Sequence, residues 1–394
     1  MDDERESVRA YGFIDAITQP DEEQNELGRS SFLIDAIRSE AIEDGSALRR
    51  EAASLLVIRL MTTFKRLQER FPGVRWTEGT WLELHLQQSY CEPPVWFVSG
   101  ADNYGGLIQR SNLVDAKIIE PDGSPDLWKS LTALCAAGKQ APRQIDTGRR
   151  DARDTIGSYH VRVVDVGQAS FTALHQHMDP ESKILGYFDV GGPIFFHHHT
   201  FPNSFPDSSR VPADGFVVLS HWDFDHYSLA VTKLLDLQNL TWFAPNQSVG
   251  PNAAKLQAKL GSRLTLLSTP TYTLAPGLNL WRGTGATTER NGSGYALKVN
   301  SLDKRVLLPG DIPYQLLPSQ ATSNISAMAI THHGGKCVGT PPPPAAKNSV
   351  AAVSYGLPNR YHHPDAASIA KHSTLGWNVQ PTFTSGRKRG DVWL

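Results

Sequence analysis

Four potential metal ligands within six residues constrain this chain more than any other feature: His221-Trp-Asp-Phe-Asp-His226. The apolar run Phe216–Leu219 precedes them and an amphipathic segment, residues 227–237, follows, so we predict a strand-to-helix turn. Alternate strand residues share a face, so His221 and Asp223 point to one side, while Asp225 and His226 can face a second centre. A polar surface loop is the alternative, but unpaired charges after a buried strand are costly. Imidazole and carboxylate ligands together suit zinc, manganese or iron.

Composition sets the class of protein. The 394 residues are 40% hydrophobic and 20% charged, as expected for one large or two ordinary globular domains. The net charge of −2 excludes the class of strongly basic proteins that coat nucleic acid. Cys91, Cys135 and Cys337 form no CxxC pair, which argues against a disulfide framework or a cysteine zinc finger. No run approaches 18 apolar residues and the first residues are acidic, so we predict a soluble, cytoplasmic protein that does not enter membranes.

The charge is divided unevenly along the chain. Residues 1–155 carry 19 Lys and Arg against 26 Asp and Glu, a net charge of −7, and the remainder carries 19 against 14, a net charge of +5. Thirteen of the 14 histidines lie at or beyond His160. We therefore predict an accessory module at residues 1–155 and a catalytic module at residues 156–394, joined within residues 140–157.

The front module carries no cluster of ligands. Phe32, Leu33, Ala36 and Ile37 fit one helical stripe and a second follows in residues 55–65, so we predict helices between residues 31 and 70. Alternation of apolar and polar residues predicts a strand at residues 81–86. This module is therefore expected to be a largely helical α+β unit that positions substrate or a protein partner. For His85, Cys91 and Cys135 we expect ordinary packing.

The back module alternates short apolar runs with Gly and Asp loops, which predicts a layered α/β fold. The expected strands are residues 160–166, 184–190, 216–220, 264–267, 295–299, 305–308, 327–331 and 351–354. The expected helices are residues 227–237, 252–260 and 365–372.

Further polar motifs follow these expected strands in a fixed order. They are Asp165-Val-Gly-Gln168, Asp189-Val-Gly-Gly192, His221–His226, Gly310-Asp311, His332-His-Gly334 and Asn359-Arg-Tyr-His-His-Pro364. The set resembles the metallo-β-lactamase superfamily and, within it, the soluble nuclease-like domain of ComEC-type DNA-uptake proteins. The resemblance covers about residues 159–375. It includes neither residues 1–155 nor the membrane channel of those transporters, so it implies no transport role.

The resemblance implies a metallo-β-lactamase-like αββα sandwich with two divalent metal ions, zinc or manganese, at one edge between the sheets. His221 and Asp223 would hold one ion, Asp225 and His226 the other, and Asp311 would bridge them. Asp223 stands where many relatives have His, and this harder oxygen ligand favours Mn²⁺ without excluding Zn²⁺. Such a pair makes hydroxide available near neutral pH and stabilises charge on both oxygens of a phosphodiester displacement.

Other site residues have more than one interpretation. Asp189 would orient ligands by hydrogen bonds or cap a Gly turn. Asp165 and Gln168 would frame the site or form only a strand-end turn. His332, at the end of an apolar run, is placed as a metal ligand, and His333 as a catalytic group with Asp225 and Asp311 or as a substrate contact.

The remaining candidates lie toward the end of the chain. His363 would be a ligand, a phosphate contact or part of a turn. His362 replaces a Gly that is common in the family and is expected to be incidental. Lys298, Lys336 and Arg360 could meet phosphates, although most such side chains only face solvent.

One departure from the family pattern concerns a missing ligand. No histidine lies between His226 and His332, an interval that usually supplies one. Either one metal has fewer protein ligands or another group substitutes. Glu289, in the polar stretch 287–290, is one candidate. His197-His-His199 is another by composition, or else an accessory loop near the mouth of the site.

The sequence thus predicts a metal-dependent phosphodiesterase that cleaves DNA or RNA. The charge of +5 on residues 156–394 is too small to establish polyanion binding by itself. A lactonase or phosphate-ester hydrolase is the alternative, because one fold hosts many substrates. A non-catalytic adaptor, in which the metal only stabilises the fold, is a third possibility.

Overall fold

The computed structural model describes residues 7–18, 28–43, 55–88, 93–99, 108–135, 159–193, 195–203, 205, 211–301, 304–359, 361–384 and 388–394. They form two units. The first contains the described parts of Met1–Gly138 together with Ser248–Lys259, and the second contains those of Lys139–Gln247 and Leu260–Leu394. The sequence-based boundary between residues 155 and 156 stays a prediction, because residues 136–158 lie outside the described ranges.

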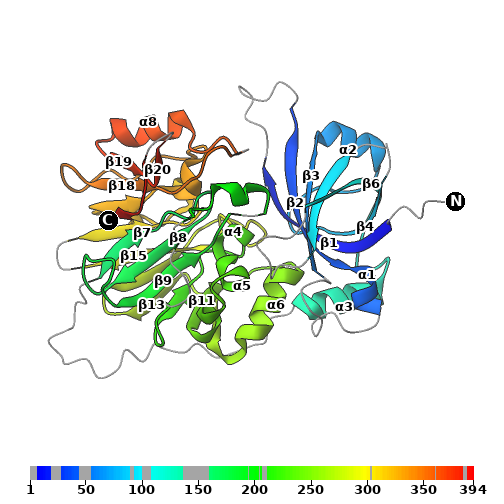
Figure 1. Ribbon diagram of the computed structural model, residues 1–394, viewed down its shortest axis with the longest axis horizontal. Helices are drawn as coiled ribbons and strands as arrows, with labels where there is room; N and C mark the ends of the chain where they lie inside the picture. The colour runs from blue at the N-terminus through cyan, green and yellow to red at the C-terminus, as the bar shows by residue number, and fades with distance from the viewer. Residues whose placement is uncertain are drawn as a thin grey trace. The chain divides into compact units, whose positions relative to one another are not determined.

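The first unit is built on a closed barrel of antiparallel strands in the order β1-β2-β3-β5-β6-β4 (Figure 1). The strands are β1 (Ser7–Thr18), β2 (Ser30–Arg38), β3 (Leu55–Thr62), β4 (Trp81–Gln87), β5 (Pro94–Ser99) and β6 (Gln109–Ile118). The helices are α1 (Ser39–Glu43), α2 (Phe64–Arg70), α3 (Pro125–Cys135) and α6 (Pro251–Leu260), all but the last residue of which belongs to this unit. Closure leaves no unpaired strand edge.

The barrel corrects the prediction of a largely helical front module. Phe32, Ile34 and Ala36 alternate along β2 and pack in the barrel core, whereas Ile37 packs in a separate cluster with Ala41. Residues four apart, such as Phe32 and Ala36, share a face in a helix and also in a strand, so their spacing did not distinguish the two. The β-branched content of β3 was the better signal. The strand predicted at residues 81–86 is confirmed as β4.

The second unit contains two seven-stranded sheets of mixed strand direction. The first sheet has the order β12-β11-β10-β9-β8-β7-β22 and the second has the order β13-β14-β15-β16-β17-β18-β19. Strands of the first sheet are β7 (His160–Val163), β8 (Phe171–His175), β9 (Ile184–Val190), β10 (Phe216–Val218), β11 (Thr241–Pro245), β12 (Leu264–Leu267) and β22 (Val392–Trp393). Strands of the second are β13 (Thr271–Ala275), β14 (Leu278–Arg282), β15 (Tyr295–Asn300), β16 (Arg305–Leu308), β17 (Ala327–Ala329), β18 (Val350–Val353) and β19 (Asn378–Pro381). A small ribbon joins β20 (Phe383–Thr384) to β21 (Lys388–Arg389).

The two sheets share one apolar core, which makes the second unit a sandwich. Val161, Phe188 and Val218 of the first sheet belong to the same buried cluster as Leu297 and Val306 of the second. Its helices are α4 (Phe224–Tyr227), α5 (Leu229–Thr232), α7 (Ser319–Thr322) and α8 (Ala366–Thr374). Figure 1 shows α8 beside β18 and β19, and α4 contacts β9. The predicted strands agree with observed ones, but the predicted helix at residues 227–237 is broken into α4, α5 and a short turn.

Parallel pairing brings the ends of distant strands to one edge of the sandwich. In the first sheet β9 and β10 run parallel, and in the second sheet β16, β17 and β18 do. The carboxyl ends of parallel strands open toward the same edge of a sheet, where ligands commonly bind. Asp189, His221, Asp311 and His332 all lie at or just beyond such ends.

Other expectations concern membranes and thiols. Among the described helices, none is long and apolar enough to cross a membrane. Cys135 and Cys337 are free thiols, and Cys91 lies outside the described residues. His85 forms a hydrogen bond of 2.7 Å with Ser7 Oγ within the barrel unit.

A buried carboxylate joins α6 to the barrel within the first unit. Asp35 of β2 is 5% exposed and accepts hydrogen bonds from the backbone N–H and side-chain amide of Asn252, at the start of α6. The backbone at Gly250 passes so close that a Cβ there would lie 2.3 Å from Asp35 Oδ2. The carboxylate therefore satisfies N–H groups that the helix leaves unpaired.

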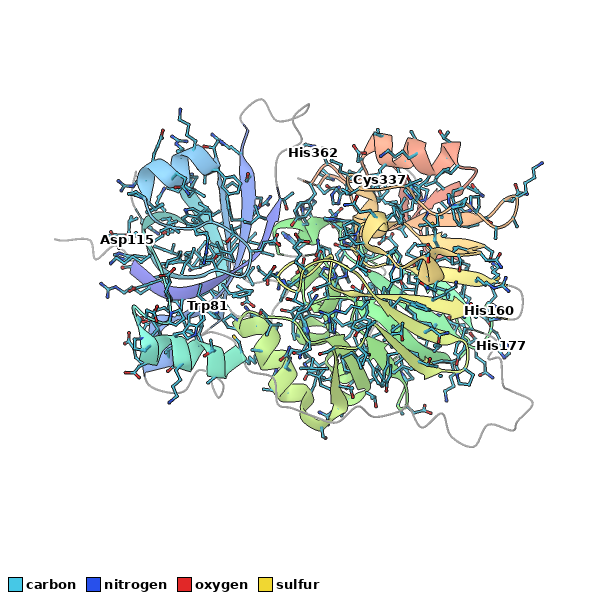
Figure 2. The ribbon with its side chains drawn as sticks, turned by 180° about the vertical axis from the view of Figure 1, so that it is seen from behind. Trp81, Asp115, His160, His177, Cys337 and His362 are labelled. Atoms are coloured by element: carbon cyan, nitrogen blue, oxygen red, sulfur yellow. The ribbon has the colours of Figure 1, made fainter. Side chains whose placement is uncertain are left out.

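We expect Asp35→Ala to lower the free energy of opening of the barrel amides by about 2 kcal/mol, because the charged hydrogen bonds to Asn252 are lost. Hydrogen exchange of β2 in the full chain measures this. Asp115→Ala is the control, since Asp115 is half exposed, lies away from the barrel core in Figure 2, forms a surface ion pair with Lys117 and accepts a hydrogen bond from the adjacent Ala116 N. A change there should stay within about 0.5 kcal/mol. Equal effects of the two variants would contradict the role of Asp35.

Candidate metal centre

Two sets of candidate ligand atoms meet at the edge of the sandwich. We define position A as His221, Asp223 and Asp311, and position B as Asp225, His226, His333 and Asp311. His221 follows β10, Asp225 and His226 lie on α4, Asp311 follows β16 and His333 follows β17. Both positions thus draw on distant parts of the chain.

In position A, His221 Nε2 lies 3.2 Å from Asp223 Oδ2 and 3.9 Å from Asp311 Oδ2. In position B, His226 Nε2 lies 3.4 Å from Asp311 Oδ1 and 3.9 Å from Asp225 Oδ1. His333 Nε2 lies 3.4 Å from Asp225 Oδ2. The two oxygens of Asp311 therefore face different positions, as a bridging carboxylate requires.

Asp189 holds the two imidazoles of the first sheet in place. Its fully buried carboxylate accepts hydrogen bonds from Ser220 N at 2.7 Å, Ser220 Oγ at 2.9 Å and His226 Nδ1 at 2.8 Å. Because the Ser220 hydroxyl donates to Asp189, its oxygen can accept from His221 Nδ1 at 2.9 Å. One carboxylate thus fixes the orientation of His226 directly and of His221 through Ser220.

The same arrangement occurs at His333, whose Nδ1 faces the carbonyl oxygen of Ser354 at 3.3 Å. A carbonyl only accepts, so Nδ1 carries a proton, and Nε2 is the ring nitrogen that faces Asp225. In the described part of the chain, Nε2 of His221, His226 and His333 is buried and makes no hydrogen bond. Buried polar atoms of this kind are rare without a partner. Three imidazoles that turn Nε2 toward carboxylates fit a divalent metal ion as the missing partner.

Two glycines let the backbone close around these side chains. A Cβ at Gly310 would lie 2.6 Å from Ser220 Cβ, and Gly310 has φ +57°. A Cβ at Gly191 would meet the backbone oxygen of Asp225. Only a residue without Cβ fits such approaches. The Gly-Asp and Asp-Val-Gly-Gly motifs therefore bring β16 and β9 against the segment His221–His226, which we call the ligand run.

In the site, burial and neighbouring charges shift the pKa values of Asp311, His226 and His333 in opposite directions, and the charges outweigh burial. Burial alone would raise the pKa of Asp311, but His226 and His332 hold it well below its usual range. Burial would lower the pKa of His226, but Asp311 and Asp189 hold it well above its ordinary value. Burial is likewise outweighed at His333, where the neighbouring carboxylates of Asp225 and Asp311 raise the pKa. The carboxylates therefore stay ionised and attract positive charge.

The two adjacent histidines have different surroundings. His333 is buried, whereas the side chain of His332 is 47% exposed, with Nε2 3.9 Å from Asp311 Oδ2. Both have left-handed backbone, with φ of +52° and +53°, which costs side-chain-bearing residues about 1–3 kcal/mol each. The structure thus groups His333, rather than His332, with Asp225 and His226.

Other predicted site residues lie farther from the ligands. Asp165 accepts two hydrogen bonds from the Arg389 guanidinium, at 2.7 and 2.8 Å, and so has a local structural partner. Gln168 contacts His363 Nδ1 at 3.2 Å. Burial and the neighbouring His332 and His333 hold the pKa of His363 well below its ordinary value, so that ring stays neutral.

The cationic residues that were predicted to contact phosphate differ in their surroundings. Lys298 is buried and donates to the carbonyl oxygens of Gln320 and Ser323, which satisfies it away from the ligands. Lys336 is exposed, and Arg360 lies outside the described residues. A cavity between the sheets is lined by Asp311, His332 and His333, among others.

Most remaining histidines do not reach the site. His362 is exposed, and Figure 2 shows His160 and His177 at the other end of the second unit from His362. His197 is buried, and its ring centroid lies 4.8 Å from that of Tyr361. The interpretation of the His197–His199 run as an accessory loop stays a prediction.

Sequence reasoning missed Arg290. Glu289, its neighbour, is exposed, whereas Arg290 is buried and its guanidinium lies 3.0 Å from Asp223 Oδ1. The interval without a histidine therefore places a cation beside the ligands. A search limited to metal-ligating residue types could not find it, and the only available signal was its place in that interval.

Comparison with solved structures gives distant similarities. The metallo-β-lactamase fold protein YhfI from Bacillus subtilis shows 13% identity and a TM-score of 0.35 over 60% of this chain and 100% of its own. The hydrolase Tm1679, described as metal-dependent and of the β-lactamase superfamily, shows 12% and 0.36 over 60% and 98%. A long form RNase Z from yeast shows 9% and 0.26 over 61% and 41%. No protein-family model and no curated protein matches. At such low TM-scores these similarities establish nothing further about this chain.

We expect Asp189→Ala to weaken binding of Mn²⁺ or Zn²⁺ by roughly 10- to 100-fold, because His226 and Ser220 lose the group that orients them. Calorimetric titration of the metal-free protein measures this. The matched control is Asp165→Ala, which removes another buried carboxylate, one held by Arg389 instead of by a ligand. If both variants bind metal like the parent protein, Asp189 does not orient the ligands.

Proposed function

We propose that this chain is a metal-dependent hydrolase of the metallo-β-lactamase fold that cleaves phosphodiester bonds in DNA, with RNA as a further substrate. The observation that supports it most is the pair of ligand positions that share Asp311. Two adjacent cation positions in one site suit in-line displacement at phosphorus, where both the attacking and the leaving oxygen carry charge.

Each residue of the centre has its own role in this proposal. His221 and Asp223 would hold one divalent ion, Asp225, His226 and His333 would hold the other, and Asp311 would contribute to both. Bound divalent ions lower the pKa of water and stabilise negative charge on phosphoryl oxygens. Mixed imidazole and carboxylate ligands suit Mn²⁺ and Zn²⁺. Asp189 fixes the orientation of the imidazoles of His226 and His221 through hydrogen bonds.

Exposed polar groups beside the ligands support a phosphate-bearing substrate. His332 is half exposed next to Asp311, and Lys336 is exposed on the same loop. Residues 156–394 carry a net charge of +5, which favours a polyanion modestly. We assign His332, Lys336 and His363 to phosphate contact, and the barrel unit to positioning of substrate or a protein partner.

A digestion assay decides between substrate classes. Metal-free protein is supplemented with Mn²⁺ or Zn²⁺ and offered plasmid, single-stranded DNA, RNA, lactones and simple phosphate esters. Cleavage of nucleic acid alone supports the proposal, and turnover of only lactones or esters identifies a small-molecule hydrolase instead. Metal binding without any turnover would fit an adaptor.

We expect Asp225→Ala to reduce DNA cleavage in Mn²⁺ to the rate without enzyme, because position B loses a carboxylate that no neighbour can replace. Asp214→Ala makes the same substitution at an exposed carboxylate paired with Lys183 and should retain the parent rate. Circular dichroism checks that both variants fold. Parent-like cleavage by Asp225→Ala would remove the basis of the proposal.

A further inference from the structure

Arg290 holds a positive charge against one ligand of the metal centre. The residue is 5% exposed, and its guanidinium contacts the Trp222 carbonyl oxygen at 3.1 Å and Asp223 Oδ1 at 3.0 Å. Its own carbonyl oxygen accepts a hydrogen bond from Gln247 at 2.7 Å. Backbone and side chain are both anchored, so the charge is fixed in place.

This charge acts on one position more than on the other. Asp223 belongs to position A and shares its two oxygens between Arg290 and His221. In the described part of the chain, neither Asp225 nor Asp311 forms an ion pair with Lys or Arg. Position B also has four protein ligands, whereas position A has three.

A fixed cation affects metal affinity in two opposite ways. Through their ion pair, Arg290 orients Asp223, and such outer partners commonly raise affinity by about 10- to 100-fold. By its charge, it neutralises part of Asp223 and repels a dication within a few ångströms, in a site where burial weakens screening. Because the site is buried and screening there is weak, the loss by repulsion outweighs the gain by orientation.

We propose that Arg290 makes the two positions unequal: position B binds its divalent ion tightly, and position A binds weakly and exchanges it. The inference rests on the metal centre of the proposed function, and adds that the weaker position is the one beside Arg290. A weakly held ion with three protein ligands leaves room for oxygen atoms of a substrate.

The test is a titration of the metal-free full chain with Mn²⁺, with the free ion counted by electron paramagnetic resonance. We expect two classes of site whose dissociation constants differ by at least about tenfold. Arg290→Gln removes the charge and keeps an amide donor, and it should tighten the weaker class by about tenfold or more. Glu289→Gln, at the exposed neighbour, should change neither class.

Two equal classes in the parent protein, or a weaker class that Arg290→Gln loosens, would overturn the inference. If Arg290→Gln does not fold, Asp223→Asn decides: it should abolish the weaker class and preserve the tighter one, and the reverse result overturns the assignment. A protein that binds no Mn²⁺ refutes this inference and the proposed function together. Two unequal classes without cleavage of any nucleic acid would refute only the nuclease.

Discussion

The site depends on one buried carboxylate. Asp189 at the end of β9 binds Ser220 and His226, and through Ser220 it also fixes His221. Burying a carboxylate without partners would be costly, so the fold must supply donors. Ser220 and His226, which belong to the segment 220–226, are two of them, and Ser170 is a third. The requirement to satisfy Asp189 and the requirement to orient two imidazoles are therefore met by the same hydrogen bonds. This couples the stability of the sheet edge to the geometry of the centre.

The segment His221–His226, the Gly310-Asp311 element and Asp189 could be named from the sequence, because these motifs agree in order with the family that the chain resembles and each follows an expected strand. The structure brings them together. His221 to His226 is a local pattern, and its neighbours along the chain decide its conformation. The choice between His332 and His333 could not be made in this way. It depends on two left-handed residues, whose side chains point where neither a strand nor a helix would send them. Arg290 was missed for another reason, because its function comes from a contact between residues 67 positions apart.

The barrel shows the limit of periodicity. Its strands are apolar on both sides where helices cover them, as at Ile37 beneath the helical residues Ala41 and Leu134. A strand that is buried on both faces loses its alternation, and short runs then resemble a helical stripe. In the sandwich, β-branched runs bounded by Gly and Asp kept the strand signal clear. The difference lies in the loops between strands, because Gly and Asp mark the strand ends more clearly in residues 159–394 than in the barrel.

Position A shows how a metal centre can keep one ion exchangeable while its ligands are buried. A carboxylate needs a positive partner when it is removed from water, whether or not metal is bound. Arg290 provides that partner permanently for Asp223, whereas in position B the carboxylate of Asp225 faces the imidazoles of His226 and His333. Those imidazoles would themselves bind an ion that enters position B. An ion that enters position A meets a guanidinium that cannot lose its charge, so the two positions differ in the species with which the metal must compete.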